Sequence, residues 1–238
     1  MKKILICAPT YNEAKNIKKL CKKILNLKYN FDLIIIDDNS PDGTSKIIKR
    51  LKLKYKNLFL LKRKKKLGIG SAIREGMNYA LKKKYNALIT LDADLSHNPK
   101  EIPLFIKNLR SYDFITGSRY IKGGGSDYGG YRDMVSRVAN KLCRFFLNMP
   151  FNEFTTSFRI YNHKCLKVLK KASLRSDGYS SQIEFFFYIY KSGLNCNEIP
   201  IKFRQRFKGN SKIPRLEVVY SALKLIELSI KRFFIKKK

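Results

Sequence analysis

The chain has 238 residues, a hydrophobic content of 44% and a formal net charge of +33, which results from 51 Lys and Arg against 18 Asp and Glu. This length fits one large domain, and the hydrophobic content supports a sizeable core and excludes wholesale disorder. The positive charge favours anionic partners, whether nucleic acid, phospholipid headgroups or phosphorylated substrates. Because the Lys residues are spread along the whole sequence, the charge permits all three kinds of partner and selects none.

The five cysteines are far apart and form no CxxC pair: they are Cys7, Cys21, Cys143, Cys165 and Cys196. Their spacing argues against a zinc site and favours a reduced, cytosolic setting. The apolar run 4–8 is too short for the core of a signal peptide and predicts a buried strand. No segment has the apolar length to span a bilayer, because charged residues interrupt the best candidate, 216–235.

In the first half of the chain, short aliphatic strands alternate with helices. The predicted strands cover residues 4–8, 33–36, 58–61, 87–91 and 114–116. The predicted helices cover residues 14–27, 44–53, 71–81 and 98–109, the last with Asn98 as N-cap and Pro99 in its first turn. This alternation predicts an α/β fold with a mostly parallel sheet and helices on both faces. In such sheets, ligands bind at the carboxyl ends of the strands.

After Gly117 the alternation stops. Five glycines between residues 123 and 130 predict a flexible loop, and a long amphipathic helix follows over 132–147. Further strands are predicted at 158–161 and 195–203, and further helices at 164–171 and 182–191. Because there is no internal repeat or low-complexity linker, we expect a single domain over 1–238, with a basic amphipathic helix at 214–238.

Two carboxylates directly follow the predicted strand 87–91, at Asp92 and Asp94. Both can turn toward one cation where the strand gives way to a loop, and such oxygen ligands suit Mg²⁺ or Mn²⁺. The metal would neutralise the charge that grows on a departing diphosphate. The same two residues also fit a solvated acidic turn that caps the next helix, and this short pattern alone leaves both interpretations open.

Two more polar clusters stand at predicted strand ends: PTYNE at 9–13 and DDNSPDGT at 37–44. Together with DAD at 92–94, they would converge on one crevice at the carboxyl edge of the sheet. Each cluster is also compatible with turn chemistry, since Asn, Asp, Pro and Gly are the usual turn residues. The presence of all three in this order favours a binding site.

These strings resemble the polyprenyl-phosphate (dolichyl-phosphate) mannose synthases of glycosyltransferase family 2. The resemblance covers nearly the whole chain and continues through LGIGSAIREGMNYAL, TGSRYIKGGG, TTSFRIY, GYSSQIE and PIKFRQRFKGNSK. It implies a GT-A (Rossmann-like) fold. It also implies a metal-dependent, inverting transfer of mannose from GDP-mannose to a polyprenyl (dolichyl-type) phosphate.

The resemblance further implies roles for the residues at matching positions. Those that would bind the nucleotide sugar are Pro9, Tyr11, Glu13, Ile36, Asp38, Asp92, Ala93, Asp94, Arg119, Arg206 and Lys212. Within this set, Asp92 and Asp94 would hold the metal, and the catalytic group would be Asp94, Arg119, Arg206 and Lys212. Arg132 and Ser136 share a helix face and match positions that bind the acceptor phosphate.

The sequence departs from the family pattern at four positions: Ser96 replaces a Gln of some relatives, Glu153 and Phe154 replace Asp-Leu, and Thr156 replaces a Gly. The last three departures concern the acceptor side and leave the donor motifs intact. Because an acceptor phosphate is already ionised at neutral pH, the reaction needs no His or Cys nucleophile. His97 is therefore interpreted as structural or exposed, whereas Gln182 and Glu184 fit either the acceptor site or a buried hydrogen-bonding role.

The last predicted helix carries apolar residues at helical spacing, with Lys and Arg between them. Such a helix can lie in the membrane interface or pack on the domain, and both interpretations remain open. In either case, we expect a peripheral protein on the cytosolic face of a membrane. Because it lacks the spanning helices of some relatives, a small membrane-anchoring partner subunit is a further expectation.

Two other functions remain as alternatives. A related polyprenyl-phosphate hexosyltransferase would use a UDP-sugar, and competition between GDP and UDP distinguishes it. A basic nucleic-acid-binding protein would show clustered Arg and Lys, exposed aromatic residues and a recognisable binding module. Because the sequence contains no such module, we expect no nucleic-acid partner.

Overall fold

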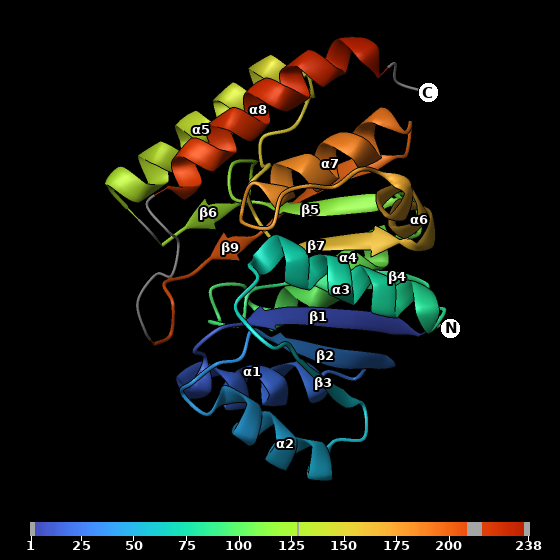
Figure 1. Ribbon diagram of the computed structural model, residues 1–238, viewed down its shortest axis with the longest axis vertical. Helices are drawn as coiled ribbons and strands as arrows, with labels where there is room; N and C mark the ends of the chain where they lie inside the picture. Colours follow the sequence, from blue (N-terminus) through green and yellow to red (C-terminus); the bar gives the residue numbers. More distant parts are fainter. Residues whose placement is uncertain (1–2, 128, 209–215, 236–238) are drawn as a thin grey trace.

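The computed structural model describes residues 3–127, 129–208 and 216–235, and a seven-stranded sheet forms its centre (Figure 1). The strand order is β3-β2-β1-β4-β7-β5-β8. These strands are β1 (Ile4–Thr10), β2 (Phe31–Asp37), β3 (Leu58–Lys62), β4 (Ala87–Thr90), β5 (Phe114–Ser118), β7 (Arg159–Asn162) and β8 (Cys196–Pro200). Only β7 runs antiparallel to its neighbours, β4 and β5. The sheet is therefore mostly parallel, as predicted.

Helices cover both faces of this sheet, which confirms the predicted fold class (Figure 1). They are α1 (Ala14–Leu25), α2 (Thr44–Lys54), α3 (Ile69–Lys82), α4 (Ile102–Asn108), α5 (Tyr131–Leu147), α6 (His163–Lys171), α7 (Ser181–Lys191) and α8 (Glu217–Phe234). Alternate residues of each strand point to opposite faces, so Ile34 and Ile36 join the core under α3 and α7, whereas Leu33 and Ile35 join the core under α1 and α2.

The start of α4 follows the chemistry predicted for it. Asn98 accepts a hydrogen bond from the backbone N–H of Lys100, and Pro99 opens a short 3₁₀ turn (Pro99–Glu101) that leads into the helix. A proline is tolerated here because the first helical N–H groups have no partner within the helix. The predicted helix 98–109 is thus present, with a tighter first turn.

The predicted strand 195–203 is divided into two strands, and each belongs to a different sheet. Its first part is β8, and its last two residues form β9 (Lys202–Phe203), which pairs with β6 (Gly125–Ser126). Ile201 connects them: its N–H donates to the Ser118 carbonyl, and its carbonyl accepts from Gly125 N–H. A Cβ at Gly117 would lie 2.8 Å from Ile201 Cγ2, so a larger residue here would force the Ile201 side chain to move. The short β6 has no apolar alternation and was not predicted.

Helices α5 and α8 lie side by side at one end of the molecule (Figure 1). Arg232 on α8 donates to the Phe146 carbonyl of α5, and Lys224 forms an ion pair of 3.2 Å with Glu184 of α7. Residues 214–215 and 236–238 of the predicted terminal helix lie outside the described residues. In the described part of the chain, no helix has the length and hydropathy needed to cross a membrane.

Candidate active site

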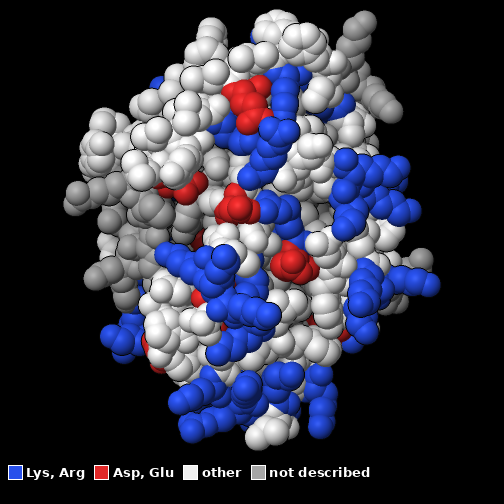
Figure 2. Space-filling view, viewed as in Figure 1, with Lys and Arg blue, Asp and Glu red and all other residues white. Residues whose placement is uncertain are grey.

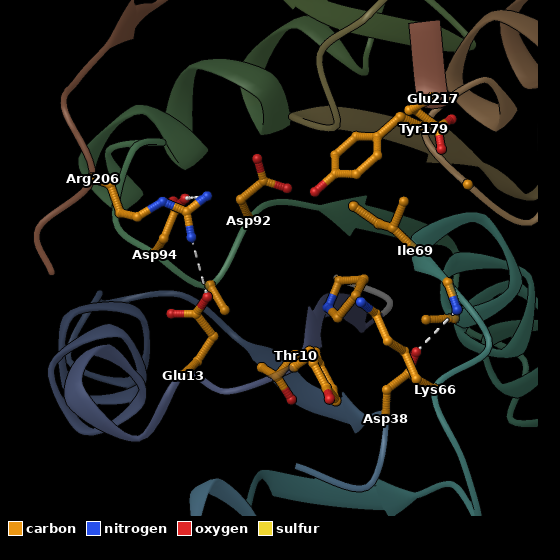
Figure 3. A pocket seen from close by; sticks show the side chains of 16 residues that line it. Thr10, Glu13, Asp38, Lys66, Ile69, Asp92, Asp94, Tyr179, Arg206 and Glu217 are labelled. Atoms are coloured by element: carbon orange, nitrogen blue, oxygen red, sulfur yellow. Dashed lines mark hydrogen bonds and ion pairs between the residues drawn. The ribbon is translucent and has the colours of Figure 1, made fainter. Parts of the chain in front are cut away.

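The three polar clusters that follow β1, β2 and β4 surround one pocket (Figure 3). The pocket residues are Pro9, Thr10, Tyr11, Glu13, Asp38, Lys66, Gly68, Ile69, Ala72, Asp92, Ala93, Asp94, Gly178, Tyr179, Arg206 and Glu217. Because β1, β2 and β4 are parallel neighbours, their carboxyl ends meet at one edge of the sheet. The sheet topology thus brings together seven of the predicted donor-site residues, and the downstream Arg206 joins them.

Asp92 presents its carboxylate to the pocket and keeps 26% of its side chain exposed. Ser157 donates a hydrogen bond of 2.5 Å to Oδ1. Burial raises the pKa of the Asp92 carboxyl above its ordinary value. Among the described residues, no Lys or Arg lies within ion-pair distance of this carboxylate. A bound cation would therefore stabilise its charged form.

His97 supports the backbone of the Asp92 loop. The N–H of Asp92 donates to His97 Nδ1 over 3.1 Å, and His97 Nε2 lies 3.3 Å from Thr156 Oγ1. The imidazole is buried between the rings of Phe158 and Phe203. Burial lowers its pKa, so the ring is neutral, and acceptance at Nδ1 places its proton on Nε2. His97 is thus structural, as its isolation in the sequence suggested.

Asp94 is held from two sides. The N–H and hydroxyl of Ser96 both donate to Oδ1, over 2.9 and 2.6 Å, while Arg206 Nη2 lies 2.9 Å from Oδ2. The other end of the guanidinium, Nη1, lies 3.4 Å from Glu13 Oε1 (Figure 3). Arg206 therefore spans carboxylates from two strand ends and lines the pocket beside both.

The segment that carries Arg206 is attached to the same loop. Arg204 N–H donates to the Ser96 carbonyl, and Phe207 N–H donates to the Asp94 carbonyl. Asn16 of α1 adds a hydrogen bond of 3.0 Å to the Lys208 carbonyl. These contacts hold residues 204–208 against the pocket although they lie more than 100 positions from Asp94 in the sequence.

Asp38 has its hydrogen bonds within the protein. Arg63 donates to Oδ1, while the N–H groups of Leu67 and Gly68 donate to Oδ2 over 3.0 and 3.1 Å. Asp38 thereby shapes the turn that leads into α3, and Lys66 from this turn lies over the ring of Tyr11, 4.5 Å from its centroid. The side chain of Ile36 is fully buried in the core and does not line the pocket.

Arg119 lies outside the pocket lining and is bound by Glu153. Its Nε and Nη2 donate to the two carboxylate oxygens over 2.6 and 2.9 Å, and Nη2 also donates to Thr155 Oγ1. Burial by itself would raise the pKa of Glu153, but the charge and hydrogen bonds of Arg119 outweigh burial and lower it. Glu153, one of the departures from the family pattern, is thus the partner of a predicted catalytic cation.

The acceptor-side predictions fall beyond this pocket lining. Ser136 lies on α5, where its carbonyl accepts a hydrogen bond from Asn140. Arg132 occupies the first turn of α5, and its side chain is not described. Lys212 lies outside the described residues.

The structure adds pocket residues that the sequence analysis did not select, chiefly Lys66, Tyr179 and Glu217. Tyr179 belongs to the GYSSQIE string, so its motif was a usable signal, whereas Glu217 opens α8 and had none. Glu184 from the same string is structural, since it accepts from the N–H groups of Arg175 and Ser176.

The carboxylate oxygens that line the pocket are suitable ligands for a divalent cation. Within the described residues, no group of three or more His, Cys, Asp and Glu side chains has the arrangement of a complete metal site. Asp92 and Asp94 nevertheless line the same pocket, and hard cations such as Mg²⁺ commonly combine one or two carboxylates with substrate phosphates and water. The two carboxylates therefore suit a metal that arrives with a diphosphate.

Comparison with known proteins agrees with this geometry. The family model for glycosyl transferase family 2 matches residues 5–169. The chain is 30% identical to the polyprenol monophosphomannose synthase of Mycolicibacterium smegmatis over 230 residues, which cover 95% of this chain and 87% of the relative. It is 29% identical to the undecaprenyl-phosphate mannosyltransferase of Micrococcus luteus over 212 residues, which cover 89% and 87%.

Solved structures share the fold at low sequence identity. Glucosyl-3-phosphoglycerate synthase from Mycobacterium tuberculosis, in a complex with Mn²⁺, UDP and glucosyl-3-phosphoglycerate, superposes with a TM-score of 0.68 at 17% identity, covering 98% of this chain and 81% of that one. The mannosyltransferase PcManGT from Pyrobaculum calidifontis, in complex with GDP-Man and Mn²⁺, gives 0.59 at 13% identity, with 98% and 74% covered. The family match and the similarity to the curated relatives both extend over most of the sequence. The chain therefore belongs to glycosyl transferase family 2 and is a glycosyltransferase.

Proposed function

We propose that this protein transfers mannose from GDP-mannose to a polyprenyl (dolichyl-type) phosphate, with inversion at the anomeric carbon. The observation that carries the proposal is the pocket in which Asp92, Asp94 and Arg206 meet the ends of β1 and β2. The names of the two curated relatives, a polyprenol monophosphomannose synthase and an undecaprenyl-phosphate mannosyltransferase, support the sugar and the acceptor class.

The nucleotide would lie along the ends of β1 and β2, against Pro9, Tyr11 and Glu13, with Asp38 and Ala93 completing the walls. Ile36 would contribute through its place in β2, beside Pro9 in register, because its side chain faces the core. In this arrangement, a flat base would lie near the aromatic ring of Tyr11, and the diphosphate would lie at Asp92 and Asp94.

Asp92 and Asp94 would hold Mg²⁺ or Mn²⁺ with the donor diphosphate, and the bound ion supplies positive charge for the leaving group. Arg206 would add a second cation, because its guanidinium already lies at Asp94. The acceptor phosphate is ionised and needs no general base, so positioning and electrostatics would supply the catalysis. The described thiols fit this mechanism: burial raises the pKa of Cys7 and Cys143 to about 12, which leaves them protonated.

The acceptor phosphate would approach from the side of α5. Arg132 and Ser136 lie in its first turns and would bind the phosphate, while Arg119 and Lys212 would add positive charge between acceptor and donor. An anionic acceptor requires such cations because the donor diphosphate repels it. Glu153 would keep the Arg119 guanidinium in place.

We further propose that the protein binds the cytosolic face of a membrane through α5 and α8. These neighbouring helices expose large apolar side chains: Tyr131, Met134, Val138, Leu142, Phe145, Phe146, Val218, Val219, Tyr220, Leu223, Ile226, Ile230, Phe233 and Phe234. Exposed apolar residues of this extent are typical of an interaction surface, and the Lys and Arg residues of the same helices suit anionic headgroups. This α5–α8 surface would place the pocket beside its lipid substrate, and a small membrane-anchoring subunit is the other occupant to test.

The direct test is sugar transfer from labelled donors to a short polyprenyl phosphate. We expect labelled GDP-mannose, and not UDP-glucose, to yield a lipid-linked sugar in the presence of Mn²⁺ or Mg²⁺. GDP should also raise the melting temperature more than UDP at equal concentration, because a ligand that binds the folded state stabilises it in proportion to ln(1 + [L]/Kd). Transfer from the UDP-sugar, together with stronger thermal protection by UDP, would overturn this proposal and would indicate that the protein transfers another hexose.

A further inference from the structure

One wall of the donor pocket comes from the C-terminal part of the chain. Gly178 and Tyr179 precede α7, and Glu217 is the first residue of α8. In Figure 3, the Tyr179 hydroxyl points toward Asp92, and Glu217 lies near the opposite end of the tyrosine, farther from Asp92. This wall stands across the pocket from Thr10 and Asp38, where the nucleoside would bind.

Glu217 enters this wall because residue 178 is a glycine. A Cβ at Gly178 would lie 2.4 Å from Glu217 Oε2, a distance at which the carboxylate would have to move. The other oxygen, Oε1, accepts a hydrogen bond of 2.9 Å from Ser180 N–H. The backbone before α7 therefore fits around this one carboxylate.

Within the described part of the chain, the Glu217 carboxylate is buried and has no cationic partner. The residue is only 7% exposed, and among the described residues no Lys or Arg side chain lies within ion-pair distance of it. A buried carboxylate is costly unless hydrogen-bond donors surround it. A ligand rich in hydroxyl groups would provide such donors, whereas a phosphate or a carboxylate would be repelled.

Tyr179 complements this carboxylate. A tyrosine phenol is protonated at neutral pH, so the hydroxyl can donate a hydrogen bond into the pocket that the residue lines. Its ring offers an apolar face to the C–H groups of a pyranose. The wall thus presents a donor, an acceptor and a flat apolar surface next to Asp92.

We propose that Tyr179 and Glu217 form the sugar subsite of the donor pocket and determine which hexose is accepted. Glu217 accepts hydrogen bonds from the sugar hydroxyls, and Tyr179 covers the ring beside the diphosphate site at Asp92 and donates a hydrogen bond from its hydroxyl to the sugar. The inference rests on the proposed function, because it presumes a nucleotide-sugar donor. It assigns recognition of the sugar to Tyr179 and Glu217, whereas the motifs at the strand ends would bind the nucleotide and the diphosphate.

The test compares the affinities of GDP-mannose and GDP for the intact protein by calorimetry with Mn²⁺ present, in wild type, Tyr179→Phe and Glu217→Gln. Both substitutions conserve shape, so the fold is expected to persist. We expect each variant to lose about 10-fold in affinity for GDP-mannose while the Kd for GDP stays unchanged, since a lost hydrogen bond to a ligand hydroxyl has about this effect. Turnover of GDP-mannose should fall in parallel.

Matched controls come from α7, which follows Tyr179, and from α8, which begins with Glu217. Tyr188→Phe on α7 and Glu227→Gln on α8 change the same chemical groups outside the pocket, so both affinities should remain at wild-type values. A variant that weakens GDP and GDP-mannose equally would assign Tyr179 and Glu217 to the nucleoside and overturn the subsite. Unchanged affinity for both ligands in both variants would also overturn it. Wild type that binds neither ligand would instead refute the proposed function.

Discussion

The two ends of the molecule use amphipathic helices in opposite ways. Around β1 and β2, the apolar face of α1 is buried through Ile17, Leu20 and Ile24, and its lysines face the solvent. At the other end, α5 and α8 leave rings such as Phe145 and Phe234 exposed, at 76% and 81%. Figure 2 shows Lys and Arg gathered over the end where α1 and α2 lie in Figure 1.

This contrast shows what the burial of an apolar helix face depends on. Helix α1 packs on a sheet that presents its own apolar face, so both surfaces leave water. Helices α5 and α8 pack on each other, and α8 also packs on α7, but no described element covers the exposed side of either helix. The apolar end would thus face the lipid, whereas the soluble donor would bind at the carboxyl ends of β1, β2 and β4.

The largest expected effect tests the donor end. Asp94→Ala should lower sugar transfer by about 1000-fold, because it removes a carboxylate that would hold the metal and the partner of Arg206. EDTA should abolish sugar transfer by the wild type, and added Mn²⁺ or Mg²⁺ should restore this activity. Circular dichroism checks that the variant is folded, and Glu75→Ala, an exposed carboxylate on α3, serves as the control. Full activity of metal-free protein in EDTA would refute the proposed requirement for a divalent metal.

A smaller effect is expected from the cation at the same end. Arg206→Ala should reduce kcat/KM for transfer by about 100-fold, because the guanidinium would no longer offset the diphosphate charge. Arg204→Ala changes an exposed arginine two residues away and should retain nearly full activity. Steady-state kinetics with GDP-mannose distinguish the two variants. Equal losses would mean that the positive charge of the segment matters and the position of Arg206 does not.

Glutamate substitutions on the α5–α8 surface test the proposed membrane binding of the apolar end. The double variant Phe145→Glu/Phe233→Glu should weaken binding to anionic phospholipid vesicles by at least about 10-fold, because each exposed ring would otherwise leave water at the interface. Calorimetric affinity for GDP should stay unchanged. Leu53→Glu provides the control, since Leu53 is 82% exposed on α2 at the basic end. If this control weakens vesicle binding as much as the double variant, the two ends do not differ in the way proposed.

The smallest expected effect concerns the ion pair beneath the acceptor side. Because the folded protein lowers the pKa of Glu153 below its ordinary value of 4.5, the unfolded state binds the proton more readily. The pair should therefore stabilise the folded state above pH 4.5, and this contribution should be lost as the pH falls through the lowered pKa.

Urea unfolding of wild type and Glu153→Gln between pH 7 and pH 3.5 measures this contribution. The free energies of unfolding should differ at pH 7 and converge in acid. Glu75→Gln should follow the wild type throughout, because that side chain is exposed. A constant difference between wild type and Glu153→Gln would show that the charge of Glu153 is not what stabilises the fold.

Local patterns were sufficient for most elements and for the donor motifs. The strands at β1, β2 and β4 follow from aliphatic runs, and the polar clusters after them follow from turn chemistry. Because parallel strands end at one edge, a parallel sheet and the position of the motifs at strand ends were enough to predict that seven residues from these clusters lie near one another. The broken strand at β8 and β9 was not foreseeable, since the crossing at Ile201 depends on the space left by Gly117.

By itself, the sequence determined the α/β fold class, the order of the elements and the family, because periodicity and motif order are local properties of the chain. Only the tertiary structure decided that Arg206 reaches Asp94 and Glu13, that Glu153 binds Arg119, and that Glu217 joins the pocket wall. These pairs join residues from 34 to about 200 positions apart. Their contacts depend on how helices and loops pack around the sheet, and no local pattern records that packing.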